Sequence, residues 1–426
     1  MVSRFTNHFR RSDRPGHRPL PCPHYPNCFG CPFIDLPYPE QLIRKRQRVI
    51  DAFGRYPMLA QLEVASVTPS PRRLGYRARV KLVVRRTKGE VAAGLYVPQS
   101  HRVIDISSCP VHPRPVNLVV QYLKRKVQEL GIVPYDERDD SGDLRYLDFR
   151  YSFARRELSV TLVTRYRDFP QGVLLARSLC RKFSFVSGVI QNINDQRGNV
   201  IWGNSFRSLA GRDTILEQMG NLKLVFPAGV FSQSNPFTAR KLYERVYDRA
   251  GLTGGETVLD LYCGVGPISL YLAAAARQVW AVDDSELSIM TAKQNARRNG
   301  VGNCRFFAGD VAAMVSQVRQ SQPQIDLIVL NPPRRGVQPA ALETMLAVNA
   351  PRIIYVSCEP TSLARDLDWF AHCFPKPKKS RRWSCCKKVN TRITCNRNTG
   401  HDFMARLLEI RNRSAATQVF ITVAAA

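Results

Sequence analysis

Short runs of β-branched, leucine and aromatic residues follow one another between residues 74 and 225. The runs are YRARVKLVVRR, VAAGLYV, HRVIDI, LRYLDFRYSF, ELSVTLVTR, VSGVIQNI, NVIWG and LKLVF. Turn sequences such as TKGE, DDSGD and NDQRG bound most of them. Because turn-bounded apolar runs of this length predict strands, we expect a mostly antiparallel β domain here. Helical segments such as VNLVVQYLKRKVQEL interrupt it.

From about residue 236 the pattern changes to an alternation of helices and buried strands. Helical patterns cover 236–250, 266–276, ELSIMTAKQNARRNG and ALETMLAVN. The apolar runs between them are ETVLDLYC, QVWAVDD, CRFFAGD, DLIVLNPP and RIIYVSC. Strands that alternate with helices of about 10 to 15 residues predict βαβ units, and so a parallel sheet covered on both faces. The fold class is therefore α/β, with a Rossmann-like doubly wound sheet that follows an α+β domain.

These patterns divide the chain into five parts. We expect a disordered basic N-terminus at 1–20, a cysteine-rich segment with a helix at 21–73, a β-rich domain at 74–225, a Rossmann-like domain at 226–373 and an atypical basic tail at 374–426. The helix of the second part covers 39–53, and Pro39 suits its first turn.

Charge narrows the choice of partners. The 426 residues carry a formal net charge of +29, which favours a polyanion, and so a nucleic acid, over a merely solvated basic surface. No run approaches the roughly 18 apolar residues of a membrane helix, and the N-terminus has no apolar signal core. We therefore expect a cytoplasmic protein, without a membrane partner, that acts as a monomer. Twelve cysteines in such a chain favour metal binding or catalysis over disulfides.

Two strand ends carry the pattern of a nucleoside-binding crevice. VLDLYCGVGP places Gly264 and Gly266 directly after an apolar strand, where the backbone can approach a ligand, although a tight structural turn has the same pattern. Asp283 ends the next strand about 20 residues later, where a carboxylate accepts hydrogen bonds from ribose hydroxyls; Asp284 is the neighbouring alternative. The glycine run lacks the full pyrophosphate motif, so S-adenosylmethionine fits better than NAD. DLIVLNPPRRG adds Asn331 and a rigid proline loop at the same edge.

A thiol ends the strand that follows. Cys358 closes the run IIYVSC, at the edge of the sheet where open α/β enzymes keep their chemistry. A helix that begins near Thr361 would favour its thiolate through the positive end of the helix dipole. A buried inert cysteine is the alternative, and the placement favours a nucleophile.

Several motifs together resemble one family, the RNA uracil-C5 methyltransferases that make 5-methyluridine, and within it the iron–sulfur enzymes that act on 23S ribosomal RNA. The matching pieces are FSQSNPFTA, VLDLYCGVGPISLYLA, VLNPPRRGV, IIYVSCEPTSLARDL, the spacing C-x5-C-x2-C at Cys22, Cys28 and Cys31 with Cys109 later, and GDLRYLDFR, QNIN and GNVIWG. The resemblance runs from about residue 20 to about residue 373.

The resemblance implies an activity and a site. Cys358 would add to C6 of a uridine in 23S ribosomal RNA, so that C5 can take the methyl group of S-adenosylmethionine. Four residues would line the cofactor site: Gln233, Tyr262, Asp283 (where the family usually has Glu) and Asn331. Cys263 is expected to pack rather than react.

The resemblance also implies a metal group. The four cysteines Cys22, Cys28, Cys31 and Cys109 would hold a [4Fe–4S] cluster. Their spacing alone leaves zinc equally open.

The tail departs from the family. Members end in a segment like D-M-F-P-H-T-x-H-x-E, whose Glu is the general base, and residues 374–426 have no such segment. The general base is therefore unassigned; Asp402 and Glu409 are the nearest acids by position. Cys385, Cys386 and Cys395 are a weak metal pattern, and QVFITVAAA favours a final strand. The abrupt change of composition suggests a reading-frame shift, which sequencing the locus would test.

Three other functions stay open on this evidence. They are N-methylation of an exocyclic base amine, methylation of a transfer RNA uridine, and RNA binding by a catalytically impaired protein of this fold.

Overall fold

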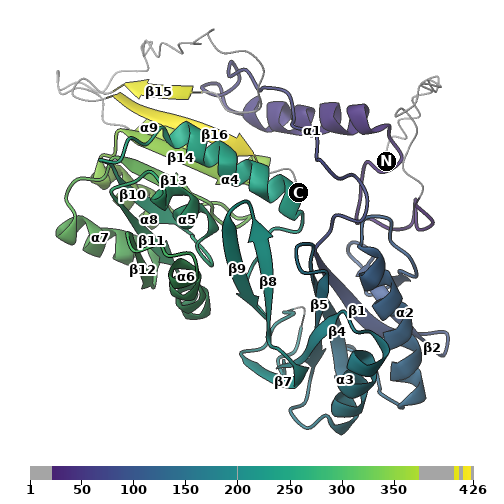
Figure 1. The fold of residues 1–426 in the computed structure, drawn as a ribbon. Helices are drawn as coiled ribbons and strands as arrows, with labels where there is room; N and C mark the ends of the chain where they lie inside the picture. Colours follow the sequence, from purple (N-terminus) through teal and green to yellow (C-terminus); the bar gives the residue numbers. More distant parts are fainter. Residues whose placement is uncertain (1–21, 199, 374–406, 412–415, 424–426) are drawn as a thin grey trace, which may run out of the picture.

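The computed structural model describes residues 22–373 except 199, together with 407–411 and 416–423. The predictions for the basic N-terminus, the segment 374–406, Cys385, Cys386, Cys395 and Asp402 concern residues outside those described. Within the described parts the strands form two seven-stranded sheets and one two-stranded hairpin (Figure 1). None of the described helices is long and apolar enough to span a bilayer.

Helices cover both sheets. The helices are α1 (Tyr38–Phe53), α2 (Arg114–Glu129), α3 (Pro170–Lys182), α4 (Pro236–Ala250), α5 (Pro267–Ala273), α6 (Glu286–Arg298), α7 (Val311–Ser321), α8 (Pro339–Val348) and α9 (Pro360–Cys373). The strands of the central sheet and the hairpin are β1 (Arg79–Thr87), β2 (Glu90–Tyr96), β3 (Val103–Asp105), β4 (Leu144–Ser152), β5 (Glu157–Thr164), β6 (Val186–Ile193), β7 (Ser205–Gly211), β8 (Thr214–Met219) and β9 (Leu222–Pro227). Those of the second sheet are β10 (Thr257–Leu261), β11 (Gln278–Asp283), β12 (Cys304–Ala308), β13 (Leu327–Leu330), β14 (Arg352–Ser357), β15 (Leu407–Arg411) and β16 (Ala416–Val423).

The central sheet has the strand order β3-β2-β1-β4-β5-β6-β7. All neighbours are antiparallel except β5 and β6, which α3 joins as a parallel crossover. The prediction of a mostly antiparallel domain is therefore confirmed. Alternate residues such as Val80 and Leu82 pack with Leu123 of α2 and Leu179 of α3, so the two helices cover one face of the sheet.

One predicted strand of this sheet is wrong. NVIWG is not a strand over 200–203, and the edge strand is β7 instead. Two buried amides explain the difference. Asn192 Nδ2 donates to the carbonyls of Gly203 and Ser205, while Asn194 Nδ2 donates to those of Val200 and Ile201. Side-chain amides thus donate hydrogen bonds to the backbone carbonyls that a neighbouring strand would otherwise satisfy.

The second sheet has the order β12-β11-β10-β13-β14-β16-β15. The strands from β12 to β16 run parallel, as predicted, and β15 is antiparallel to β16. The predicted final strand is confirmed as β16, which pairs with β14 along its length. The order reverses between β10 and β13, which makes this a doubly wound, Rossmann-like sheet.

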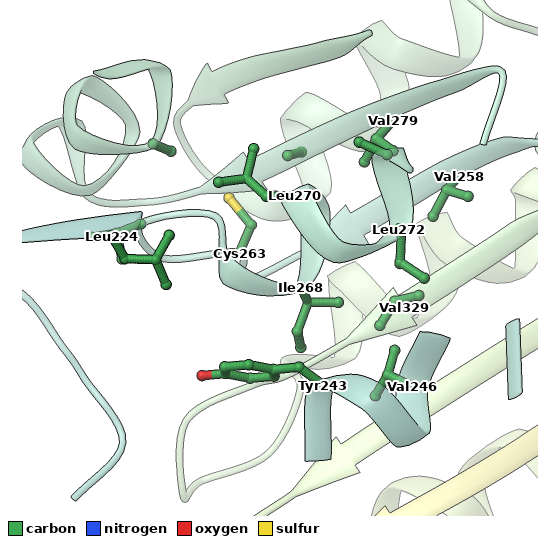
Figure 2. Packing of buried hydrophobic residues seen from close by; sticks show 14 of the residues in the cluster. Leu224, Tyr243, Val246, Val258, Cys263, Ile268, Leu270, Leu272, Val279 and Val329 are labelled. Carbon is green, nitrogen blue, oxygen red and sulfur yellow. The ribbon is translucent and has the colours of Figure 1, made fainter. Parts of the chain in front are cut away.

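Apolar residues fill both faces of this sheet, which is why its strands read as continuous hydrophobic runs. One face packs against α1, α7, α8 and α9, and the other against α4, α5, α6 and the β8–β9 hairpin. Figure 2 shows the second cluster, with Tyr243 and Val246 of α4 facing Ile268 and Leu272 of α5. Cys263 points into this cluster and burial raises its pKa well above the ordinary value, so the expectation that it packs is confirmed.

The two sheets are joined through the β8–β9 hairpin and through helix α1, among other contacts. The hairpin β8–β9 lies between them, with β8 against β4 and β5 and β9 against α6 (Figure 1). The carboxylate of Glu217 in β8 accepts hydrogen bonds from the backbone N–H groups of Phe153 (2.8 Å) and Ala154 (3.1 Å), in the β4–β5 turn. Helix α1 packs on α9, so the segment before the central sheet also contacts the far end of the second sheet.

Candidate active site

Polar side chains gather at one edge of the second sheet, where four neighbouring parallel strands end. Asp283 ends β11, Tyr262 follows β10, Asn331 follows β13 and Cys358 follows β14. Because these strands are adjacent in the order β11-β10-β13-β14, all four residues lie along the carboxyl edge, around the point where the strand order reverses. Ligands of open α/β sheets bind at this switch point.

Asp283 is held against the glycine turn. Its two carboxylate oxygens accept hydrogen bonds from the N–H groups of Gly264 (2.8 Å) and Ser285 (3.1 Å). Burial raises its pKa, and Asp284 beside it acts in the same direction. Asp284 itself is exposed. Gly266 has a φ of 84°, a conformation that suits glycine, and α5 begins with the next residue.

Tyr262 has an unusual backbone. Its φ is 61°, in the left-handed region that costs an ordinary residue roughly 1–2 kcal/mol. The side chain is half-buried, and burial raises the pKa of its hydroxyl to about 12. Asp310, just after β12, and Arg335, in the loop after β13, both affect this pKa. Tyr262 follows β10, which lies between β11 and β13 in the sheet, at the point where the strand order reverses.

The loop after β13 is fixed from behind by Asp366 of α9. This buried carboxylate accepts hydrogen bonds from the N–H of Val337 (2.8 Å) and the hydroxyl of Tyr355 (2.7 Å). Arg365 pairs with its other oxygen and donates to the carbonyl of Arg335. Sequence reasoning missed Asp366; its only signal is an acidic residue within the apolar pattern of α9.

Cys358 and Gln233 occupy different settings. Cys358 is half-buried in the turn between β14 and α9, where the hydroxyl of Ser357 accepts a hydrogen bond from the N–H of Glu359 (3.1 Å). Gln233 comes from outside the sheet edge, on the loop between β9 and α4. That loop is tied to the central sheet, because the carbonyl of Ser234 accepts a hydrogen bond from the N–H of Ala78 (2.7 Å).

The four predicted metal ligands come from two segments that contact each other. Cys22, Cys28 and Cys31 lie before α1, and Cys109 lies just before α2. The ring of His24 bonds the backbone of Ser108, which joins the segments. Burial raises the pKa of Cys109 to about 11, and the thiols of Cys31 and Cys22 act in the same direction.

The arrangement of these thiols does not form a closed site for one ion. Throughout the described residues, no group of three or more His, Cys, Asp or Glu side chains is placed so that it could hold a metal ion. Zinc would require sulfurs about 3.8 Å apart around bonds of about 2.3 Å. The structure therefore brings the four cysteines to one region and leaves open what they bind. Glu409 lies in β15, and the described residues identify no general base.

Comparison with known proteins agrees with this geometry. Residues 214–375 match the family model of tRNA (Uracil-5-)-methyltransferase. An uncharacterized RNA methyltransferase of Geobacter sulfurreducens is 39% identical over 350 residues, which cover 82% of this chain and 71% of the relative. A second, from Halalkalibacterium halodurans, is 37% identical over 364 residues, which cover 84% and 78% of the two chains.

A solved structure extends the likeness to the fold. The crystal structure of Pyrococcus abyssi tRNA (uracil-54, C5)-methyltransferase in complex with S-adenosyl-L-homocysteine is similar, with a TM-score of 0.66 and 27% identity. The likeness covers 80% of this chain and 78% of the other. The chain belongs to the RNA uracil-C5 methyltransferase family and is an S-adenosylmethionine-dependent RNA methyltransferase.

Proposed function

We propose that this enzyme methylates C5 of a uridine in 23S ribosomal RNA and that Cys358 is its nucleophile. The observation that carries the proposal is the placement of Cys358 on the strand end two positions along the sheet edge from Tyr262. The crevice at the switch point would hold the cofactor between the glycine turn and the loop after β13, with Gln233, Tyr262, Asp283 and Asn331 in contact with it. A uridine that enters beside it would meet the thiol.

The chemistry follows from the weakness of uracil C5 as a nucleophile. The Cys358 thiolate forms a bond to C6, which moves electron density onto C5 and the neighbouring carbonyl. S-adenosylmethionine supplies an electrophilic methyl group, and C5 takes it as the carbon–sulfur bond of the sulfonium breaks. A base then removes the C5 proton, the C5=C6 bond re-forms and the thiolate leaves. The target base must leave its stack to reach the thiol.

The test uses the full chain, S-adenosylmethionine and 23S ribosomal RNA that lacks its 5-methyluridines. We expect 5-methyluridine by nucleoside mass spectrometry with the wild type and none with Cys358→Ala. If the protein forms a covalent adduct with RNA on a denaturing gel, the adduct needs Cys358 and no 5-methyluridine appears, then Cys358 adds to the base but the C5 proton is not removed. Methylation retained by Cys358→Ala would refute the mechanism and favour transfer to an exocyclic amine, which needs no thiol.

Transfer RNA is the second candidate substrate. The matching family model is named for a tRNA uracil-5 methyltransferase, and the similar solved structure acts by its name on uracil-54 of tRNA. The same assay with unmodified transfer RNA separates the two. Product on transfer RNA alone would replace the ribosomal proposal.

We also propose that Cys22, Cys28, Cys31 and Cys109 hold a [4Fe–4S] cluster. Support comes from their convergence from two segments, since the thiols of Cys22 and Cys31 both act on the pKa of Cys109, and from four thiolates being the usual ligand set of such a cluster. A resident cluster would cross-link the segment before α1 to the central sheet. We expect protein purified without oxygen to be brown and to lose its colour in Cys31→Ser. A colourless preparation with stoichiometric zinc would refute the cluster.

A further inference from the structure

A cavity of about 420 Å³ lies where the central sheet meets the loop that precedes α4. Among the described residues its walls include three arginine and three aromatic side chains and no acidic one. These six are Arg72, Arg114, Arg156, Tyr151, Phe153 and Phe237. They come from four places in the chain: the connection from α1 to β1, the start of α2, the β4–β5 hairpin and the first turn of α4. The cavity therefore forms only when these four parts of the folded chain pack together.

The three aromatic rings form one cluster, in which the ring of Tyr151 is inclined to that of Phe153 by 87° and the ring of Phe237 by 59°. The ring of Phe153 lies 4.8 Å from that of Phe237 and 5.0 Å from that of Tyr151, measured between centroids. The guanidinium of Arg72 lies 4.9 Å from the Phe153 centroid and 5.5 Å from the Phe237 centroid. Its Nε donates to the carbonyl of Leu74, which fixes the group in this position. A planar cation over half-buried rings gives a surface on which a nucleobase stacks.

The positive charges of the cavity are not neutralised by the protein. No acidic side chain of the described chain pairs with Arg114 or Arg156, and both are exposed. Arg114 opens α2, whose first turn has no acidic residue and no side-chain cap. Burial raises the pKa of Tyr151, Arg156 and Arg72 act in the opposite direction, and Glu217 acts in the same direction as burial. Such a site attracts an anion that itself carries a flat ring.

Arg156 has a conformation that favours glycine. Its φ is 54°, which costs an arginine roughly 1–2 kcal/mol that glycine does not incur. The residue ends the turn between β4 and β5, a position where glycine is common. Backbone strain at a residue whose side chain lines a cavity is typical of binding sites.

We propose that this cavity binds one unstacked nucleotide of the RNA substrate, with its base against the Phe153 ring and the Arg72 guanidinium and its flanking phosphates at Arg114 and Arg156. The inference rests on RNA being the substrate and deepens the proposed function, since it names where a nucleotide other than the target is held. The volume suits a single nucleotide. Phe237, in the first turn of α4, lies four residues after Gln233 in the sequence. An RNA strand bound at the cavity would therefore run toward the crevice of the second sheet.

The test compares two arginines of the same turn. Arg156→Gly removes a lining side chain and relieves the strained backbone, whereas Arg155→Ala removes the same charge from a residue that does not line the cavity. The probes are unmodified 23S ribosomal RNA and transfer RNA transcripts, bound at several salt concentrations. We expect Arg156→Gly to weaken binding about 10-fold and to lower the salt slope by about one, and Arg155→Ala to change affinity less than about 2-fold.

A second variant tests stacking separately from charge. Phe153→Leu keeps an apolar side chain, and we expect it to weaken RNA binding about 10-fold with an unchanged salt slope. Thermal unfolding at a temperature no lower than that of the wild type, together with unchanged calorimetric binding of S-adenosylhomocysteine, excludes a folding defect in each of the three variants.

Equal losses in Arg156→Gly and Arg155→Ala would overturn the proposal, because they would show a general charge effect. Binding by Phe153→Leu equal to the wild type would also overturn it. If the wild type methylates RNA and these variants bind RNA normally, the nucleotide site in the cavity is refuted and the proposed function stands. If the variants bind RNA more weakly as expected but the wild type transfers no methyl group, the proposed function is refuted and the nucleotide site stands.

Discussion

At the scale of single residues, the crevice depends on groups held in costly states. Tyr262 has a left-handed backbone, and the glycine turn beside it is pinned by the Asp283 carboxylate. Beneath them Asp260 is fully buried at the end of β10, with one oxygen bonded to the hydroxyl of Ser269 and the other without a partner. A buried carboxylate with so few donors is destabilising when it is ionised.

Asp260 should make the free energy of unfolding depend on pH. Burial raises its pKa from 3.8 to about 7, and Asp283 nearby acts in the same direction. Because the folded-state pKa lies above the unfolded one, its contribution is fully present below about pH 4 and is lost as the pH rises to 7. Between pH 5 and 8 we expect the wild type to lose about 3 kcal/mol relative to Asp260→Asn, measured by urea unfolding. Parallel pH curves for the two proteins would contradict this.

At the scale of elements, the strands of the second sheet were predictable and those of the first less so. LIVL and IIYV are apolar or aromatic throughout and VLDL is apolar except for the buried Asp260, because both faces of the sheet are covered. The ends of these strands place Tyr262, Asn331 and Cys358. The strands β7 and β8, and β15 at the edge of the second sheet, were not predicted. The sequence SFRSLAG of β7 is mostly exposed and has no alternation of apolar residues. The edge strand was predicted at NVIWG instead, where two asparagine amides donate hydrogen bonds to the backbone carbonyls.

The candidate site divides in the same way. Residues that directly follow a predicted strand could be placed from sequence, since parallel strands end at one edge. The Asp366 contact with the loop after β13, and the cavity walls, could not be placed. They depend on pairs such as Val337 with Asp366, or Arg72 with Phe237, which meet only through the packing of separate elements.

Helix α9 should hold the loop after β13 in place through Asp366. Asp366→Asn replaces one of the two acceptor oxygens by a donor, which must then face either the Val337 N–H and the Tyr355 hydroxyl or the guanidinium of Arg365. We expect a loss of about 1–3 kcal/mol in the free energy of unfolding and roughly 10-fold weaker binding of S-adenosylhomocysteine. Asp368→Asn is the control, two residues along the same helix, where the acid faces His372 instead. Unchanged cofactor affinity in Asp366→Asn would show that the loop is held by other contacts.

At the scale of the whole molecule, the chain's first described helix completes the core of its last domain. Val49, Ala52 and Phe53 of α1 share one buried cluster with Leu363, Leu367 and Phe370 of α9. The central sheet lies between these helices in sequence and joins the second sheet through the hairpin and Glu217. The boundaries assigned from sequence stay predictions, but the helix at 38–53 packs with the Rossmann-like layer.

Removal of this contact should destabilise the molecule. We expect Phe53→Ala to lower the free energy of unfolding by about 3–5 kcal/mol, because it leaves a cavity between α1 and α9. Ile43 lies on the same helix and is 66% exposed, so Ile43→Ala should cost less than about 0.5 kcal/mol. Similar small losses in both variants would mean that α1 only rests on the surface.

The contact between α1 and α9 can form only late in the synthesis of the chain. The apolar stripe of α1 leaves the ribosome more than 300 residues before the helix that covers it. At about 5–20 residues per second, the stripe is exposed to the cell for roughly 15 to 60 seconds. The nascent chain is therefore a natural client for chaperones, and expression at low temperature or with added chaperone should raise the yield of folded protein.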